Sequence, residues 1–281
     1  MTETLDPVVA GAGEPVVEVT GLVTHYGPRE ILHGVDMHVN AGEIMVIMGG
    51  SGSGKSTLLR HLLGLERPTS GRVRILGQDL SQLDESDRTA FSRKIGVAFQ
   101  GGALFSSMTV GENVMLPLFE HTDLDRTTME IMMRLKLELV SLSGFENLMP
   151  SELSGGMVKR AAFARAVIMD PPVLFCDEPS AGLDPVVAAG LDELILQLRD
   201  ALRMTIVVVT HELDSAFRIA DRITVLDQGD ILVSADTGTV RSSPNERVQD
   251  LLQRRFEEDE PDPEEYLRRL TSGPALGRTG A

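Results

Sequence analysis

A glycine-rich loop offers the clearest chemistry in this sequence. Residues 49–56 read Gly-Gly-Ser-Gly-Ser-Gly-Lys-Ser, which fits the P-loop pattern of a glycine, four intervening residues and Gly-Lys-Ser. Glycines let the backbone curl so that its N–H groups face phosphate oxygens, and a following helix adds its positive N-terminal end. We therefore expect Lys55 to reach the β- and γ-phosphates and Ser56 to bind Mg²⁺. The residues predicted to contact the nucleotide in this loop are Gly49, Gly50, Ser51, Gly52, Ser53, Gly54, Lys55, Ser56 and Thr57.

Two adjacent carboxylates follow an apolar run further along the chain. Residues 173–176 read as a buried strand, and Asp177 and Glu178 come directly after it. Open α/β sheets bind ligands where their parallel strands end, so these carboxylates are expected beside the P-loop. Asp177 is predicted to hold Mg²⁺, and Glu178 to orient and polarise the attacking water. Phosphoryl transfer needs mainly positioning and charge neutralisation, so the pattern predicts hydrolysis of a nucleoside triphosphate.

Alternating strand and helix patterns must position these groups. Residues 44–48, directly before the loop, are all apolar and are typical of a buried parallel strand, and residues 57–65 read as a helix. Asp184 and Pro185 suit the N-cap and first turn of the next helix. The remaining predicted strands span 16–24, 31–39, 73–76, 95–99, 206–209, 223–226 and 231–233. This order predicts an α/β core.

Helical patterns dominate between the strand at 95–99 and the strand at 173–176. This block, roughly 101–168, includes a methionine-rich stretch with Met129, Met132 and Met133. Methionines at helical spacing favour packing inside the block. The alternative that the sequence leaves open is an adaptable docking surface for a partner.

Composition limits the classes of protein and compartment. The chain has 281 residues and a net charge of −16, which argues against nucleic-acid binding because phosphate contacts dominate that affinity. Cys176 is the single cysteine, so no internal disulfide is possible, and its apolar neighbours predict a buried thiol. No apolar run approaches the ~20 residues that span a bilayer, and residues 1–14 lack the pattern of a signal peptide. We expect a cytoplasmic protein; if it serves a membrane, another chain supplies the membrane part.

A second helix start links the sequence to a family. Leu153-Ser154-Gly155-Gly156-Met157 resembles the signature of ABC (ATP-binding cassette) ATPases, which usually ends in Gln where Met157 stands here. The resemblance implies an α/β P-loop NTPase cassette with a mixed β-core, an antiparallel β-subdomain and an inserted α-helical subdomain. It also implies that Ser154, Gly155 and Gly156 contact the γ-phosphate of ATP held by a partner cassette. Two copies would then pair head to tail around ATP and Mg²⁺.

Further positions match the same family in order along the chain. The resemblance implies that Tyr26 stacks on adenine and that Gln100, after a strand, meets Mg²⁺ and the water. Residues 180–184 match the D-loop, which ends in Asp184 and crosses the pair interface. His211, directly after a strand, matches the switch histidine that contacts the γ-phosphate. The implied catalytic residues are therefore Glu178, His211 and Gln100, and the implied metal-binding residues are Ser56, Gln100 and Asp177.

Within the ABC ATPases, the chain is similar to those of the Mla (maintenance of lipid asymmetry) and Mce-associated phospholipid transporters. The segments that carry this closer resemblance are 101–105, 108–110, 113–114, 117–118 and 149–157, with Met157 at the end of the signature. It implies an integral membrane permease, an Mce-domain substrate-binding protein and a small STAS-domain subunit as partners. The substrate would be a phospholipid or another hydrophobic molecule. The cassette itself would lie on the cytoplasmic face of the inner membrane and contact the membrane only through the permease.

The chain is predicted to divide into three parts. Residues 1–14 read as a disordered leader, 15–240 as the ATP-binding domain, and 241–281 as a C-terminal extension with an acidic linker. In the family such an extension reaches the partner cassette, a role that Arg254, Arg255, Phe256 and Tyr266 could serve. The alternative interpretation is an unstructured solubilising tail.

Other functions remain open at this point. One alternative is the ATPase of another solute transporter. Another is a soluble ABC ATPase, such as a scaffold subunit for iron–sulfur cluster assembly. Repair and chromosome types place long coiled coils between the P-loop and the signature, and translation factors carry two cassettes in one chain. This sequence has neither feature, and the pattern of the helical block favours a transporter.

Overall fold

The computed structural model describes residues 15–253. The first two strands of this part of the chain belong to a four-stranded antiparallel sheet. Its strands are ordered β2-β1-β4-β5. Their bounds are Pro15–Tyr26 for β1, Arg29–Asn40 for β2, Ser70–Ile75 for β4 and Gln78–Asp79 for β5. The strands predicted at 16–24 and 31–39 are therefore present and extend further at both ends. This sheet confirms the expected antiparallel β-subdomain.

A mixed six-stranded sheet forms the centre of the molecule, in the order β10-β9-β3-β8-β7-β6. Strands β9, β3, β8, β7 and β6 run parallel, and β10 closes the sheet as an antiparallel edge. All residues of β3 and β8 are buried, as the continuous apolar runs predicted. The bounds are Ile44–Met48 for β3, Ile95–Ala98 for β6, Val173–Asp177 for β7, Thr205–Thr210 for β8, Arg222–Asp227 for β9 and Asp230–Asp236 for β10.

The central strands separate two hydrophobic cores, because successive side chains point to opposite faces. Val46 and Val208 belong to the core shared with the helices of the inserted block. Met45 and Val207 belong to the core shared with the antiparallel sheet and α1 (Lys55–Leu62). Helix α1 is thereby fixed between the two sheets, directly after the predicted phosphate loop.

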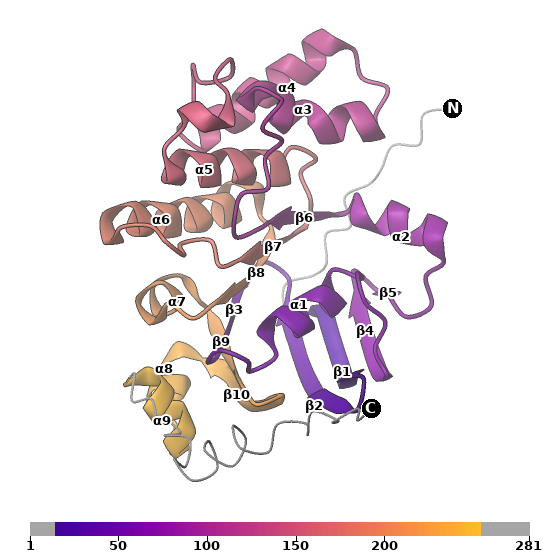
Figure 1. Cartoon of the computed structure of the whole chain (residues 1–281), viewed down its shortest axis with the longest axis vertical. Helices are drawn as coiled ribbons and strands as arrows, with labels where there is room; N and C mark the ends of the chain where they lie inside the picture. The colour runs from indigo at the N-terminus through magenta and orange to yellow at the C-terminus, as the bar shows by residue number, and fades with distance from the viewer. Residues whose placement is uncertain (1–14, 254–281) are drawn as a thin grey trace, which may run out of the picture.

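The inserted block lies at one end of the molecule, away from α1 and the antiparallel strands (Figure 1). Its helices are α3 (Val110–His121), α4 (Arg126–Leu139), the short 3₁₀ turn η1 (Pro150–Glu152) and α5 (Gly155–Ala166). Met129 and Met133 are buried and Met132 packs against the same core, which confirms their packing role. Two further helices follow the block and cover the same face of the sheet: the long α6 (Pro185–Leu202) and, after β8, the short α7 (Leu213–Ile219).

Three helices were not predicted from the sequence. They are α2 (Glu85–Ser92), α8 (Thr237–Arg241) and α9 (Glu246–Leu252). The predicted domain boundary at residue 240 falls inside α8, where Val240 is buried in the core, as is Val248 of α9. The predicted leader 1–14 lies outside the described residues, as do Arg254, Arg255, Phe256 and Tyr266. No helix within 15–253 is long and apolar enough to cross a membrane.

Candidate functional site

Parallel pairing brings the predicted chemical groups to one edge of the central sheet. In the register of the strands, Met48 faces Thr210, Val209 faces Asp177, and Cys176 faces Ala98. The P-loop leaves β3, Glu178 leaves β7, His211 leaves β8, and Gln100 follows β6 after one residue. These groups therefore meet at the carboxyl ends of the strands, where open α/β sheets bind ligands.

The P-loop backbone tolerates only glycine at two points. A Cβ on Gly49 would lie 2.0 Å from the carbonyl oxygen of Leu226. Gly54, the residue before α1, has φ +105°, and a Cβ there would lie 2.8 Å from Leu32 Cδ2. The loop is thus held tightly against neighbouring strands in the curled form that exposes its N–H groups.

The start of α1 is prepared for an anion. Gly54 provides no side-chain cap, so the first N–H groups of the helix have no side-chain acceptor. Lys55 Nζ donates to the carbonyl oxygens of Gly49 and Gly50, at 2.8 Å each, and so lies over the loop. Burial lowers the pKa of Lys55, while the charges of Glu178 and Asp177 raise it. The remaining predicted loop residues are the exposed Ser51, Gly52 and Ser56 and the buried Ser53 and Thr57.

Glu178 is clamped by groups from several elements. Its Oε1 lies 2.8 Å from His211 Nδ1, and its Oε2 accepts a hydrogen bond from Thr210 Oγ1 at 3.2 Å. Lys159 of α5 donates to its carbonyl oxygen at 3.2 Å. Its backbone φ is +45°, a left-handed conformation that costs about 1–3 kcal/mol for a non-glycine residue. Such a fixed carboxylate is suited to holding a water molecule.

Asp177 and Ser56 fit a magnesium ion that arrives with a nucleotide. Burial raises the pKa of Asp177, the neighbouring Glu178 charge raises it further, and Lys55 lowers it. Nowhere in residues 15–253 do three or more His, Cys, Asp or Glu side chains form a metal cluster. A magnesium ion typically needs only one or two protein carboxylates when phosphates supply the other oxygens. Gln100 is exposed beyond β6 and completes the predicted metal set.

The signature residues lie away from the P-loop of the same chain. Ser154 caps α5, its Oγ accepting from Met157 N at 3.3 Å. A Cβ on Gly156 would lie 2.6 Å from Val187 Cγ1 of α6, so α5 and α6 pack closely there, while Gly155 is exposed. Helices α5 and α1 pack in different cores on opposite sides of the central sheet (Figure 1). The structure therefore does not bring Ser154 and Lys55 together within one chain.

The last two predicted positions are Asp184 and Tyr26. Asp184 caps α6, its Oδ1 accepting from Val186 N and Val187 N at 3.1 Å each, which confirms the predicted helix start. Tyr26 ends β1 on the antiparallel sheet with 44% of its surface exposed, and its hydroxyl donates to Glu66 Oε2. An exposed aromatic ring at this place is free to stack on a flat partner.

Sequence reasoning missed the residues that hold the clamped carboxylate. Thr210 and Lys159 contact Glu178, but neither stands in a pattern that singles it out. The one available signal was the position of Thr210, a hydroxyl residue at the end of an apolar strand directly before His211. Cys176, in contrast, is buried as predicted, and burial raises the pKa of its thiol.

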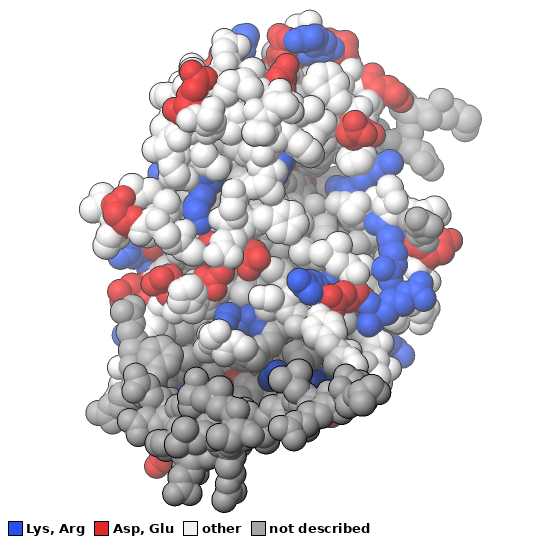
Figure 2. Space-filling model, in the orientation of Figure 1, with Lys and Arg blue, Asp and Glu red and all other residues white. Residues whose placement is uncertain are grey.

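Among the described residues, part of the surface over the inserted block is free of charged side chains. Figure 2 shows this uncharged stretch across the middle of the block, whereas charged side chains stand along its upper rim, at α4, and gather again lower on the same face. Large apolar side chains exposed on the block are Phe105, Phe119, Leu124, Ile131 and Leu135. When such side chains form one continuous patch, the patch commonly marks a binding site for another protein.

Several known proteins are similar to this chain. A protein-family model described as ABC transporter matches residues 32–181. The chain is 38% identical over 239 residues to the "Probable ribonucleotide transport ATP-binding protein mkl" of Mycobacterium leprae, covering 82% of this chain and 69% of the relative. It is 41% identical over 258 residues to the "Methionine import ATP-binding protein MetN" of Escherichia coli K12, covering 90% and 74%. A solved dimer of the ATP-binding cassette MJ0796 with ADP and Pi has TM-score 0.72, 32% identity, and coverage of 78% of this chain and 98% of that chain.

Proposed function

Because this chain belongs to the ABC transporter family of ATP-binding cassettes, we propose that it is the ATP-hydrolysing subunit that energises a membrane transporter. One observation carries this proposal: four parallel strands end at one edge, and there Glu178 is fixed by His211 and Thr210 beside the P-loop. Phosphoryl transfer depends on such positioning more than on covalent chemistry.

Each residue of the predicted site has a role in the proposal. Lys55 and the N-terminus of α1 neutralise charge on the phosphates, and Ser56 with Asp177 and Gln100 holds Mg²⁺, which supplies further charge neutralisation when bound. Glu178 orients the attacking water and accepts its proton. His211 keeps Glu178 in place and contacts the γ-phosphate, while Tyr26 stacks on the base.

The second half of the site comes from a second copy. Since α5 and α1 lie on opposite sides of the sheet, Ser154 and Gly156 reach a γ-phosphate only across an interface between two chains. We infer a head-to-tail pair with ATP between the P-loop of one chain and the signature of the other. The D-loop, ending in Asp184, lies at that interface. The relative MJ0796 was solved as a dimer with ADP and Pi.

A complementation experiment tests the pairing. Lys55→Ala removes the phosphate contact, and Ser154→Asp keeps the helix cap but sets a negative charge against the γ-phosphate. Each variant alone should lose hydrolysis, because both sites of its pair are damaged. A one-to-one mixture should recover activity, because one site then combines an intact P-loop with an intact signature. No recovery in a mixture that is shown to form mixed pairs would refute a site shared between chains.

For the substrate, we propose a phospholipid or another hydrophobic molecule. The support is the resemblance of the inserted block and of Met157 to Mla and Mce-associated ATPases, and the uncharged surface that would receive a permease. The partners in this proposal are the permease, an Mce-domain protein and a STAS-domain subunit, with the cassette on the cytoplasmic side of the inner membrane. A second candidate is import of a small polar solute, which the names of the methionine and ribonucleotide relatives favour.

Purification of the chain from its native membranes separates the two candidates. Recovery of a permease with an Mce-domain protein and bound phospholipid would support lipid transport. Recovery of a permease with a soluble amino-acid or nucleotide receptor would refute it. The ATPase activity itself stands in either outcome.

A further inference from the structure

The hydroxyl of Tyr26 is held by a neighbouring carboxylate. It donates to Glu66 Oε2 at 2.6 Å, and Arg60 Nη1 of α1 donates to the other oxygen, Oε1, at 3.2 Å. The Glu66 side chain is only 27% exposed, whereas the Tyr26 ring stays open to solvent. Both oxygens of the Glu66 carboxylate therefore accept hydrogen bonds, one from the hydroxyl of Tyr26 and one from Arg60 in the helix that follows the P-loop.

A buried histidine fixes the backbone at the same place. His61 is 1% exposed, and its Nδ1 lies 3.2 Å from the carbonyl oxygen of Glu66. A carbonyl only accepts, so Nδ1 carries the proton and Nε2 accepts from the hydroxyl of Thr24 at 2.7 Å. Burial lowers the pKa of His61, which favours this neutral form. The histidine thus ties α1 to β1 two residues before Tyr26.

Helix α1 therefore connects the residues predicted to contact the phosphates with those that hold Tyr26, which is predicted to contact the base. Lys55 and Ser56 stand at its first turn, and Arg60 and His61 stand in its last turn. A helix of eight residues is a stiff spacer of roughly 12 Å. We propose that Glu66 is a positioning residue that sets the Tyr26 ring at a fixed place relative to the P-loop, so that base and phosphates bind together. This proposal rests on the proposed nucleotide site, in which Tyr26 stacks on adenine.

A plain structural role is the competing explanation. The Arg60–Glu66 ion pair lies at the surface, with the Arg60 side chain 56% exposed, and surface ion pairs contribute little to stability. A positioning role must therefore show in ligand binding. The test compares ATP with inorganic tripolyphosphate, which contains the phosphates but no base. Binding of each to the full chain in Mg²⁺ is measured by calorimetry.

Glu66→Ala should weaken ATP binding roughly three- to tenfold, the scale of one aromatic contact. Tripolyphosphate affinity should not change, and the hydrolysis rate at saturating ATP should be that of the parent. Glu66→Gln should retain most of the ATP affinity, because its amide oxygen still accepts from Tyr26. The matched control is Glu18→Ala, which removes a partly exposed carboxylate of β1, the strand that carries Tyr26; Glu18 is paired with Arg74 at 3.7 Å. It should leave both affinities unchanged.

A double-mutant cycle tests the path of the effect. Tyr26→Phe keeps the ring but loses the hydroxyl, so it should reproduce the Glu66→Ala loss, and the two changes together should be no worse than either alone. Equal weakening of ATP and tripolyphosphate by Glu66→Ala would overturn the proposal, because the effect would then act through the P-loop. If Tyr26→Ala weakens ATP binding and Glu66→Ala does not, only the positioning role fails. If Tyr26→Ala has no effect, the stacking role in the proposed function fails as well.

Discussion

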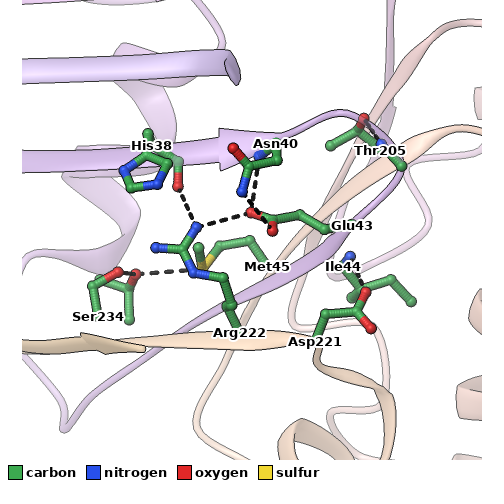
Figure 3. Close-up of polar contacts among 11 residues, drawn as sticks. His38, Asn40, Glu43, Ile44, Met45, Thr205, Asp221, Arg222 and Ser234 are labelled. Atoms are coloured by element: carbon green, nitrogen blue, oxygen red, sulfur yellow. Dashed lines mark hydrogen bonds and ion pairs between the residues drawn. The ribbon is translucent and has the colours of Figure 1, made fainter. Parts of the chain in front are cut away.

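The two ends of the same parallel strands differ in how their polar groups are satisfied. At the amino ends, Arg222 donates to the carbonyl oxygen of His38 at 3.2 Å and to Glu43 Oε1 at 3.1 Å (Figure 3). Glu43 also accepts from the backbone and side-chain nitrogens of Asn40, at 2.9 and 3.1 Å. The start of β3 is held by a carboxylate as well, since Asp221 accepts from Ile44 N at 2.8 Å. The polar groups at this edge are therefore satisfied by one another.

The carboxyl ends are arranged in the opposite way. Glu178 is strained at φ +45°, and Lys55 has backbone carbonyls as its only hydrogen-bond partners in the described part of the chain. The hydroxyls of Ser53 and Ser180 are buried without a partner among residues 15–253. Buried polar groups are normally paired, so this edge has given up stability.

The difference shows that one sheet divides its tasks between its two edges. Groups at the amino edge satisfy one another and contribute to stability. The carboxyl edge keeps a strained Glu178 and two buried hydroxyls that no described residue pairs with, a loss of stability in favour of activity that functional sites commonly show. Substitutions at the two edges should therefore separate activity from stability.

The largest expected effect is on hydrolysis by Glu178→Gln. Loss of a general base lowers the rate on the order of 10²–10⁴-fold, while ATP binding and the melting temperature should stay close to the parent values. Phosphate release in a single turnover and calorimetric binding measure the two properties. The matched control is Glu43→Gln at the amino edge, which should keep the rate per folded molecule. Hydrolysis at the parent rate by Glu178→Gln would contradict the assigned role.

Arg222→Ala should give the largest loss of stability. It leaves the Glu43 side chain, only 12% exposed, without its charged partner, and loss of such a partner costs about 2–4 kcal/mol. Urea unfolding measures the change, and ATP affinity should be unaltered. Arg222 begins strand β9 and Asp227 ends it. Arg247→Ala removes the exposed ion pair between Arg247 and Asp227, and should cost less than about 1 kcal/mol. Equal losses for the two variants would contradict a special role of the amino-edge network.

Asp177→Asn should stabilise the protein at neutral pH, although it removes a predicted Mg²⁺ ligand and therefore slows hydrolysis. The pKa of Asp177 in the folded chain is raised above its ordinary value of 3.8. Between these two pKa values the folded chain keeps a proton that the unfolded chain has released, so the stability of the fold falls as pH rises from the lower value to the higher one. An amide carries no charge and removes this loss of stability. Melting temperatures from pH 4 to 7 should show a growing advantage of the variant. Glu43→Gln, which neutralises a carboxylate at the amino edge, should lower the melting temperature instead.

The two edges also differ in how far the sequence predicts them. Glycines and Lys55 of the P-loop stand in one short motif, and Glu178 and His211 each follow an apolar strand, so local patterns combined with parallel pairing are enough to assemble the site. The amino-edge network joins Arg222 to Glu43 across 179 residues, and no local pattern links them. Helices α8 and α9 escaped prediction for a related reason, since each presents a single fully buried valine to the core.

The smallest expected effects have opposite signs at the two edges. Thr205 at the amino edge accepts from Gly42 N at 2.9 Å, so Thr205→Val leaves that donor without its partner and should cost about 1 kcal/mol. Ser180 has a buried hydroxyl without a partner in the described structure. Ser180→Ala removes the desolvation free energy that this hydroxyl costs, and should raise stability by up to about 1 kcal/mol. Urea unfolding of the two variants, each without nucleotide, measures both changes. A loss of stability in Ser180→Ala as large as that in Thr205→Val would mean that the carboxyl edge satisfies its polar groups as fully as the amino edge does.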